Sequence, residues 1–258
     1  FFICNNFMQD ITLSGIRGSI AQYVRLATQV FRPFFSIEVR ADQLEKYRLE
    51  HEGLTYTPLL MKAIAATVKD YPLMNAVVSR GFFGIKVLVP DEVDICFAVE
   101  KTYKGETFVA VPVIRGVEKK SIQTIASEIR TISELPYDKL PGIKPVLLFH
   151  KYPYFVKYIH LKLICRFPRL FKELFGTIAF SNLGKFGVQV ASPTWVNAVT
   201  FVIGSIEEKP AIIDGGIKNM PVLHITMGFD HAVFDGAEAG RILQTFKALI
   251  ENGNYDSL

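Results

Sequence analysis

The sequence predicts a mixed α/β fold in which helices pack on one face of a sheet. Apolar residues recur at helical spacing in residues 57–71, 119–132 and 237–250. Helices and strands are interspersed without a strict βαβ rhythm, which favours a mixed sheet. The predicted strands, rich in β-branched residues or alternating in polarity, are Phe35–Arg40, Val93–Val99, Thr107–Arg115, Thr177–Ser181, Thr200–Ile206 and Val222–Phe229.

Each predicted helix carries its apolar side chains on one face. In the first, Pro58 suits the opening turn, where the backbone amides have no partner within the helix. In the last, Gly253 follows the final apolar position as a stop signal. The residues on this face are Leu60, Ala63, Ile64, Thr67 and Val68 in the first, Ile122, Ile125, Ala126, Ile129 and Ile132 in the second, and Ala239, Ile242, Leu243, Phe246, Leu249 and Ile250 in the third.

The composition indicates a folded chain with a large core. Half of the 258 residues are hydrophobic and 21% are charged, which argues against disorder and fits one large domain or two small ones. No apolar run is long enough to predict a membrane-spanning helix. The chain opens with Phe-Phe-Ile-Cys rather than Met, which indicates processing or a partial sequence.

The cysteine pattern gives little support for a metal site or a disulfide framework. The three cysteines, Cys4, Cys96 and Cys165, are an odd number and form no CxxC pair. Their use fits a reducing compartment. Cys96 lies in an apolar run, so we expect a small buried residue rather than a nucleophile.

Residues 143–175 depart from the rest of the chain. They hold seven of the 29 Lys and Arg residues and one of the 25 acids, so the net charge of +4 belongs to this segment. This distribution argues against a nucleic-acid-binding surface. The segment reads as short amphipathic helices inserted into the domain. Two interpretations are open for these helices. In one, an exposed face contacts a membrane surface or a partner protein; in the other, the helices form an extra layer whose lysines point into solvent.

The candidate active residue is His231. A strand pattern ends near Phe229 and a helix pattern begins near Ala237, which places His231 and Asp235 in a tight connection. Gly236 allows the backbone to turn there. A neutral imidazole takes a proton from a thiol or alcohol and returns it later. Taken alone, however, a histidine in a loop is more often a structural residue.

Several motifs in order give the chain a wider resemblance. The sequence His-x-x-x-Asp-Gly at 231–236 resembles the active-site motif of the dihydrolipoyl acyltransferases of 2-oxoacid dehydrogenase complexes and of the chloramphenicol acetyltransferases. The other matching segments, which together cover nearly all of 55–250 outside 143–175, are Thr57–Ala63 (TPLLMKA), Tyr71–Ala76 (YPLMNA), Val111–Arg115 (VPVIR), Gly176–Gly187 (GTIAFSNLGKFG), Ile203–Gly204 and Lys209–Pro210.

The resemblance implies a role for each matched residue. His231 corresponds to the general base that deprotonates coenzyme A, dihydrolipoamide or an acceptor hydroxyl. Ser181 corresponds to the donor that stabilises the tetrahedral oxyanion. Asp235 corresponds to an aspartate that forms a structural ion pair, with Arg17 or Arg25 as the expected cation. Asn182 and Gly236 are expected to shape the coenzyme A and substrate site.

The resemblance also implies a fold, an assembly and partners. We expect a chloramphenicol-acetyltransferase-like mixed-sheet sandwich over 1–258, a single catalytic domain with the insertion at about 143–175. In the family, trimers form with the base of one subunit facing the serine of its neighbour, and trimers build 24-mers or 60-mers. Coenzyme A or acyl-CoA is the implied substrate, with no metal. The implied partners are 2-oxoacid dehydrogenase components, and the location is cytoplasmic, or the mitochondrial matrix in a eukaryote.

Departures from the family pattern leave three functions open. No lipoyl or subunit-binding domain is present, so a lipoyl group would come from a missing domain or a partner. Gln22 and Tyr23 replace the usual basic residue after the Ile-Arg-x-x-Ile-Ala motif, which puts the ion pair to Asp235 in doubt. The first function is acyl transfer to a dihydrolipoyl-type thiol. The others are a stand-alone coenzyme-A-dependent acyltransferase for a small hydroxyl or amine compound, and a non-catalytic trimeric scaffold.

Overall fold

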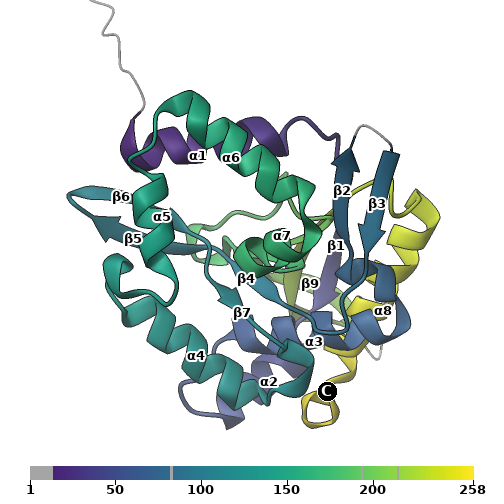
Figure 1. Ribbon diagram of the computed structural model, residues 1–258. Coiled ribbons are helices and arrows are strands. Elements are labelled where there is room, and N and C mark those ends of the chain that lie inside the picture. Colours follow the sequence, from purple (N-terminus) through teal and green to yellow (C-terminus); the bar gives the residue numbers. More distant parts are fainter. Residues whose placement is uncertain (1–13, 82–83, 193, 214) are drawn as a thin grey trace, which may run out of the picture.

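A mixed six-stranded sheet crosses the centre of the molecule (Figure 1). The computed structural model describes residues 14–81, 84–192, 194–213 and 215–258. In the sheet, β8 runs parallel to both of its neighbours and the other pairs are antiparallel, which confirms the predicted mixed sheet. The strands in spatial order are β1 (Phe34–Arg40), β10 (Gly216–Phe229), β9 (Val199–Ile213), β8 (Ile178–Asn182), β4 (Ile95–Phe97) and β7 (Val113–Ile114).

Two predicted strands are each divided in the structure. The run 93–99 forms β4 and then β5 (Val99–Tyr103), and β5 pairs with β6 (Glu106–Ala110) outside the main sheet. The run 107–115 forms β6 and β7, separated by Pro112, which has no amide hydrogen to donate. Two hairpins lie outside the main sheet. One is formed by β5 and β6, and the other by β2 (Val77–Gly81) and β3 (Gly84–Leu88).

Four helices cover one face of the sheet and build the main core with it. They are α2 (Asp42–Glu50), α3 (Tyr56–Asp70), α4 (Ile122–Glu134) and α8 (Gly236–Asn252). The three helices predicted from apolar spacing are confirmed as α3, α4 and α8, with ends shifted by one to three residues. Alternate side chains of the central strands enter this core, including Ile178 and Phe180 of β8. Ala179 and Ser181 alternate with these two residues along β8 and consequently face the other side of the sheet.

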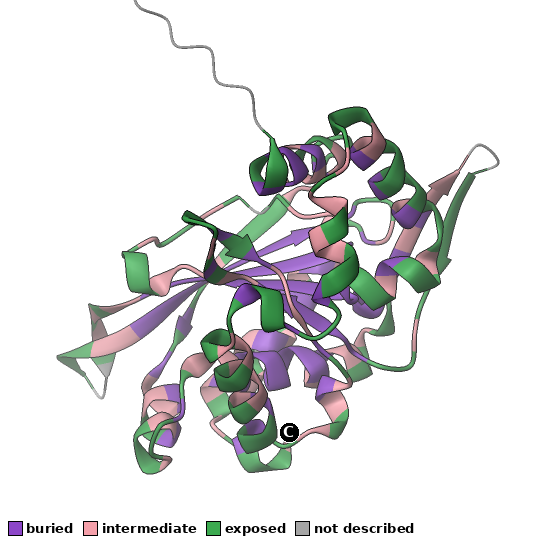
Figure 2. Ribbon diagram, turned by 60° about the vertical axis from the view of Figure 1, so that its left-hand side comes forward, coloured by how far each residue is buried: buried purple, intermediate pink, exposed green. Residues whose placement is uncertain are grey.

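A second layer of helices lies on the opposite side of the molecule from α2, α3 and α4. It consists of α1 (Gly15–Ala27), α5 (Ile143–Phe149), α6 (Tyr154–Arg166) and α7 (Pro168–Phe175), and Figure 2 shows the buried strands between the two groups. Helical structure in 143–175 is therefore confirmed. None of the helices in the described part of the chain is long and apolar enough to cross a membrane.

Two lysines of this inserted segment point inward. Lys157 is 2% exposed, and its ammonium group donates to the carbonyl of Gly15 over 2.8 Å, which ties α6 to the start of α1. Burial lowers the pKa of Lys157. Lys172 of α7 forms an ion pair with the buried Asp94 at 3.1 Å. The expectation that the lysines of an extra layer all point into solvent is wrong for these two, because each satisfies a buried oxygen.

His150 provides a further link between the inserted segment and α1. Its Nδ1 lies 2.8 Å from the Ser19 hydroxyl, and its Nε2 lies 2.8 Å from the Tyr137 hydroxyl. The Ser19 hydroxyl donates to the carbonyl of Gly15, so it accepts from Nδ1–H and leaves Nε2 to accept from Tyr137. Burial, and then the nearby Lys157, lowers the pKa of His150 to about 4, so the folded state favours the neutral ring.

We therefore expect this link to weaken in mild acid. The folded pKa of His150 lies below the unfolded value of 6.5, so its contribution to stability is complete above pH 6.5 and is lost as the pH falls towards 4. The protection factors of the amide hydrogens in α5 and α6, which correct for the intrinsic pH dependence of exchange, should fall over this window in the wild type. They should show no such step in His150→Gln, whereas the exposed His160→Gln should behave as the wild type. An identical acid step in His150→Gln would contradict this assignment.

Cysteine placement agrees with the expectation for Cys96. Its side chain is fully buried, and burial raises the pKa of its thiol. Cys165 is half-buried on α6, while Cys4 lies outside the described residues. Cys96 is thus a small core residue, as predicted.

Candidate active site

His231 lies on an exposed turn between β10 and α8, as the sequence predicts. The turn covers residues 231–233, directly after the sheet and two residues before the helix N-cap. Within the described chain the imidazole makes no hydrogen bond, and its ring lies 6.0 Å from that of Phe229. Both ring nitrogens are consequently available to a ligand or to a second protein chain.

The preceding residue, Asp230, fixes the shape of this turn. Its side chain is almost fully buried and accepts the amide hydrogen of Ala232 over 3.0 Å. Its backbone carbonyl accepts from the amides of Val233 and Phe234. The guanidinium group of Arg80, on β2, contacts both carboxylate oxygens, at 2.5 and 2.6 Å. A buried carboxylate needs such a charged partner, so the pair holds the backbone that presents His231.

Removing the charge on Arg80 should loosen this turn. Arg80→Ala would leave the Asp230 carboxylate buried without its partner, and we expect a loss of about 1–3 kcal/mol in the free energy of unfolding, since Arg80 is partly exposed. Urea unfolding measures this loss. Lys86→Ala, on the exposed neighbouring strand β3, is the matched control and should change stability by less than about 0.5 kcal/mol. Equal stability of the two variants would show that the ion pair does not hold the turn.

Asp235 caps the N-terminus of α8. Its Oδ1 accepts the amide hydrogen of Glu238 over 2.8 Å, and its backbone is extended, as an N-cap requires. The expected ion pair to Asp235 is not formed by Arg17 or Arg25 in the chain as described. Arg17 donates to the carbonyl of Thr107, and Arg25 lies over the ring of Tyr158. The reason is that α1 packs along the inserted α6, which directs both arginines towards other elements.

Ser181 lies near the end of β8, on the face of the sheet that is turned away from the main core. Its side chain is 8% exposed and makes no hydrogen bond to any residue that the structure describes. Thr226 and Val202 lie level with it on neighbouring strands and are also small. A serine hydroxyl in this position is free to donate to a bound oxyanion.

Asn182 and Gly236 each contribute to the local structure near the candidate site. The Asn182 side-chain oxygen accepts from the amide of Gly184 over 3.0 Å, which shapes the turn after β8. Its amide group lies 3.4 Å from the Thr57 hydroxyl at the start of α3. Gly236 is the first residue of α8, and a side chain there would touch the ring of Phe35 at 3.4 Å. Asn182 thus follows Ser181 directly, and Gly236 lies in the same connection as His231.

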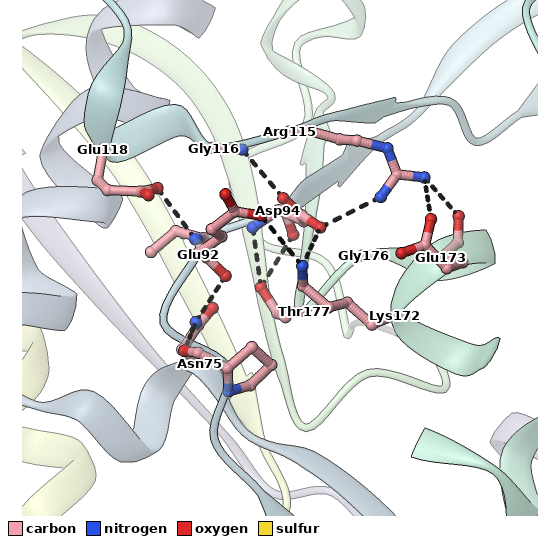
Figure 3. A network of polar contacts seen from close by, with 12 residues as sticks. Asn75, Glu92, Asp94, Arg115, Gly116, Glu118, Lys172, Glu173, Gly176 and Thr177 are labelled. Atoms are coloured by element: carbon pink, nitrogen blue, oxygen red, sulfur yellow. Dashed lines mark hydrogen bonds and ion pairs between the residues drawn. The ribbon is translucent and has the colours of Figure 1, made fainter. Parts of the chain in front are cut away.

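A network around Asp94 fixes the start of β8 (Figure 3). The fully buried carboxylate accepts from the amide of Gly116 and pairs with Lys172 and Arg115. The backbone carbonyl of Asp94 accepts from the amide and the hydroxyl of Thr177. Gly176 is required beside it, because its φ is +62° and a Cβ there would lie 2.6 Å from the Asp94 carbonyl oxygen. The strand that carries Ser181 is therefore rigidly anchored.

Within one chain, His231 and Ser181 lie towards opposite ends of the central strands. Phe229, the last residue of β10, is level with Val199 and with Ile178, where β8 begins. Ser181 lies three residues further along, roughly 10 Å in the strand direction and another 10 Å across two strand spacings from Phe229. His231 comes two residues after Phe229, so the chain carries it further away from Ser181. The imidazole and the hydroxyl of a single chain do not form a joint site.

The sequence pointed to His231 but not to the residues that hold it. Asp230 was identifiable as the neighbour of His231 at a strand end, whereas Arg80 lies 150 positions away in a hairpin that periodicity did not predict. In the described part of the chain, no group of three or more His, Cys, Asp and Glu side chains is placed to hold a metal ion.

Comparison with known proteins identifies the family of the chain. The family model for the 2-oxoacid dehydrogenases acyltransferase catalytic domain matches residues 6–139 and 172–256. The chain is 27% identical over 221 residues to the dihydrolipoyllysine-residue succinyltransferase component of the 2-oxoglutarate dehydrogenase complex of Staphylococcus saprophyticus. That alignment covers 84% of this chain but only 44% of the relative. The chain thus spans less than half the length of that protein.

Solved structures show the same fold. Dihydrolipoamide acetyltransferase of Azotobacter vinelandii superposes with a TM-score of 0.72 at 20% identity, covering 97% of this chain and 94% of that one. A chloramphenicol acetyltransferase superposes with a TM-score of 0.50 at 16% identity, covering 90% and 93%. The expected chloramphenicol-acetyltransferase-like fold is confirmed. Since the family model matches most of the chain and leaves out 140–171, this protein belongs to the family of 2-oxoacid dehydrogenase acyltransferase catalytic domains.

Proposed function

We propose that this chain transfers an acyl group between coenzyme A and a dihydrolipoyl-type thiol. The observation that carries the proposal is a pair of side chains that make no hydrogen bond within the described chain, His231 on an exposed turn and Ser181 on an anchored strand, in a member of an acyltransferase family. The A. vinelandii relative, whose catalytic mechanism has been investigated through a serine, a histidine and an asparagine, supports the same residue types.

The reaction needs one base and one hydrogen-bond donor. The neutral His231 removes the proton of the acceptor thiol, and the thiolate attacks the carbonyl carbon of the acyl thioester. The Ser181 hydroxyl donates to the oxyanion of the tetrahedral intermediate. Collapse of the intermediate breaks the bond to the original sulfur, which leaves as a thiol with the proton held by His231. The thioester is already activated, so these residues need only orient, deprotonate and stabilise.

We infer that the two residues meet between copies of the chain. Within one chain they lie towards opposite ends of the central strands, and His231 is exposed, so a second copy can bring its Ser181 to the imidazole. Exposed aromatic side chains lie near the end of β10 that precedes His231: Phe34 is level with Gly228, and the ring of Phe35 packs on that of Phe229. Such residues are typical of an interface. A homotrimer, alone or within a larger shell, is the proposed assembly.

The proposal also includes the extent of the domain, the carrier of the lipoyl group and coenzyme A. We propose 1–258 as a single catalytic domain with the inserted helices at about 143–175. A dihydrolipoyl group would be carried by another domain or by a partner among the 2-oxoacid dehydrogenase components. Coenzyme A, as a substrate, would occupy the shared site.

One observation favours a second candidate, a stand-alone coenzyme-A-dependent acyltransferase for a small hydroxyl or amine compound. The family model does not match residues 140–171, and α7 is bonded through Lys172 to the Asp94 network directly before β8. The insertion therefore lies close to the strand that carries Ser181, where it would alter acceptor binding.

An acceptor comparison separates the two candidates. Purified protein is given acetyl-CoA or succinyl-CoA with dihydrolipoamide, or with a panel of small alcohols and amines, and release of free coenzyme A is followed. The leading proposal predicts turnover with dihydrolipoamide that exceeds turnover with every alcohol and amine. Preference for an alcohol or amine would establish the second candidate. No transfer to any acceptor, together with no coenzyme A binding by calorimetry, would leave a non-catalytic scaffold.

A further inference from the structure

Helices α6 and α7 expose a row of large apolar side chains. On α6, Phe155, Ile159 and Leu163 point outward, and the row continues through Phe167 to Leu170 on α7. Phe155 is 66% exposed and Phe167 is 57% exposed. The opposite side of α6 is also apolar, because Leu161 and Ile164 pack in the core against β2. The outward row is therefore additional to what the fold needs.

Cations are interspersed with this apolar row. Lys162 lies on the same side of α6 as Phe155 and Ile159, while Lys151 precedes the helix and Arg169 follows it, and all three are exposed. The apolar–basic face is defined by these three residues together with Phe155, Ile159, Leu163, Phe167 and Leu170. Arg166 is excluded because its guanidinium group packs against Gly81.

The inserted segment itself has little negative charge, although Asp91 and Glu92 line a pocket beside Arg169 and Leu170. Glu173 is the one acid between residues 143 and 175, and it pairs with Arg115 at 3.1 Å. The cations of the apolar–basic face are thus not neutralised by acids of their own segment. An anionic partner is the complementary one.

This combination fits a lipid surface better than a protein. The core of a protein interface is depleted of lysine, yet here Lys162 lies among the apolar side chains. At a bilayer, by contrast, apolar side chains enter the acyl boundary while the long cationic side chains reach the phosphates. The layer is also held rigidly to the sheet, through Lys172 with Asp94 and Lys157 with Gly15.

We propose that the apolar–basic face of α6 and α7 binds the surface of an anionic membrane, with α6 lying in the plane of the headgroups. The site is separate from His231 and Ser181, and the family model does not match the residues of α6. Binding would hold the catalytic domain at a membrane without crossing it.

Vesicle co-sedimentation of the full chain tests this proposal. Phosphatidylcholine vesicles with phosphatidylglycerol should retain the protein at low salt and release it at high salt, and pure phosphatidylcholine vesicles should retain little. Neutralising Lys162→Gln and Arg169→Gln should weaken binding by roughly fivefold for each charge removed. Phe155→Ser should weaken it by about tenfold or more.

The α2 helix provides matched controls. Lys46→Gln and Leu49→Ser change an exposed cation and an exposed leucine on the other side of the fold and should leave vesicle binding unchanged. No retention by anionic vesicles at low salt would overturn the proposal. So would equal weakening by the control variants. If Phe155→Ser reduces the size of the assembly in sedimentation velocity while the wild type binds no vesicles, the face is an interface between copies instead.

Discussion

Replacing His231 with alanine should lower the rate of coenzyme-A-dependent transfer by about 10²–10⁴-fold, the usual contribution of a general base. The loss should appear in kcat, because the imidazole acts on the proton of the attacking thiol and not on ground-state binding. The free energy of unfolding should change little, since the ring is exposed and makes no hydrogen bond within the described chain.

His160→Ala is the matched control for this experiment. His160 is also exposed, lies in the inserted α6 and has no part in the proposed chemistry. It should retain wild-type turnover. Wild-type turnover in His231→Ala would remove the mechanism, whereas loss of folding in that variant, measured by circular dichroism, would contradict the exposed position of the ring.

Replacing Ser181 with alanine should lower kcat by about 10²–10³-fold, which is the effect of removing one donor to an oxyanion. KM should change little, because the hydrogen bond strengthens as charge develops on the carbonyl oxygen. The substitution removes a hydroxyl that has no partner within the described chain, so stability should be preserved or slightly raised.

The control for Ser181 is Ser127→Ala on α4, an exposed serine that bonds only to its own helix. Its turnover should equal that of the wild type. If Ser181→Ala raises KM with kcat unchanged, the hydroxyl contributes to substrate binding and is not the oxyanion donor.

Local periodicity explains which elements could be predicted. The helices α3, α4 and α8 each present a continuous apolar face to the sheet, and they were predicted to within a few residues. By contrast, α2 (Asp42–Glu50) is mostly polar, with Leu44 and Tyr47 as its buried residues, so its period is weak. Strand β3 is exposed along its whole length, and no alternation marks it. Tertiary packing fixes such elements, and single-sequence patterns do not record it.

The site was predictable where its residues adjoin one another in sequence. His231 and Asp235 share one short connection, and Asp235 followed three residues later by Glu238 is also the pattern of a helix N-cap. That pattern would have indicated capping by Asp235 instead of an ion pair with Arg17. The contact between Arg80 and Asp230 joins distant segments, so only the folded chain shows it.

Subunit complementation tests the shared site most directly. His231→Ala and Ser181→Ala chains are co-expressed with different tags, and assemblies that contain both are purified and assayed for transfer from acetyl-CoA. If His231 of one copy acts with Ser181 of its neighbour, each trimer that contains both variants has one intact site of its three, and activity rises far above that of either variant alone. Mixed assemblies no more active than the separate variants would contradict a site shared between copies.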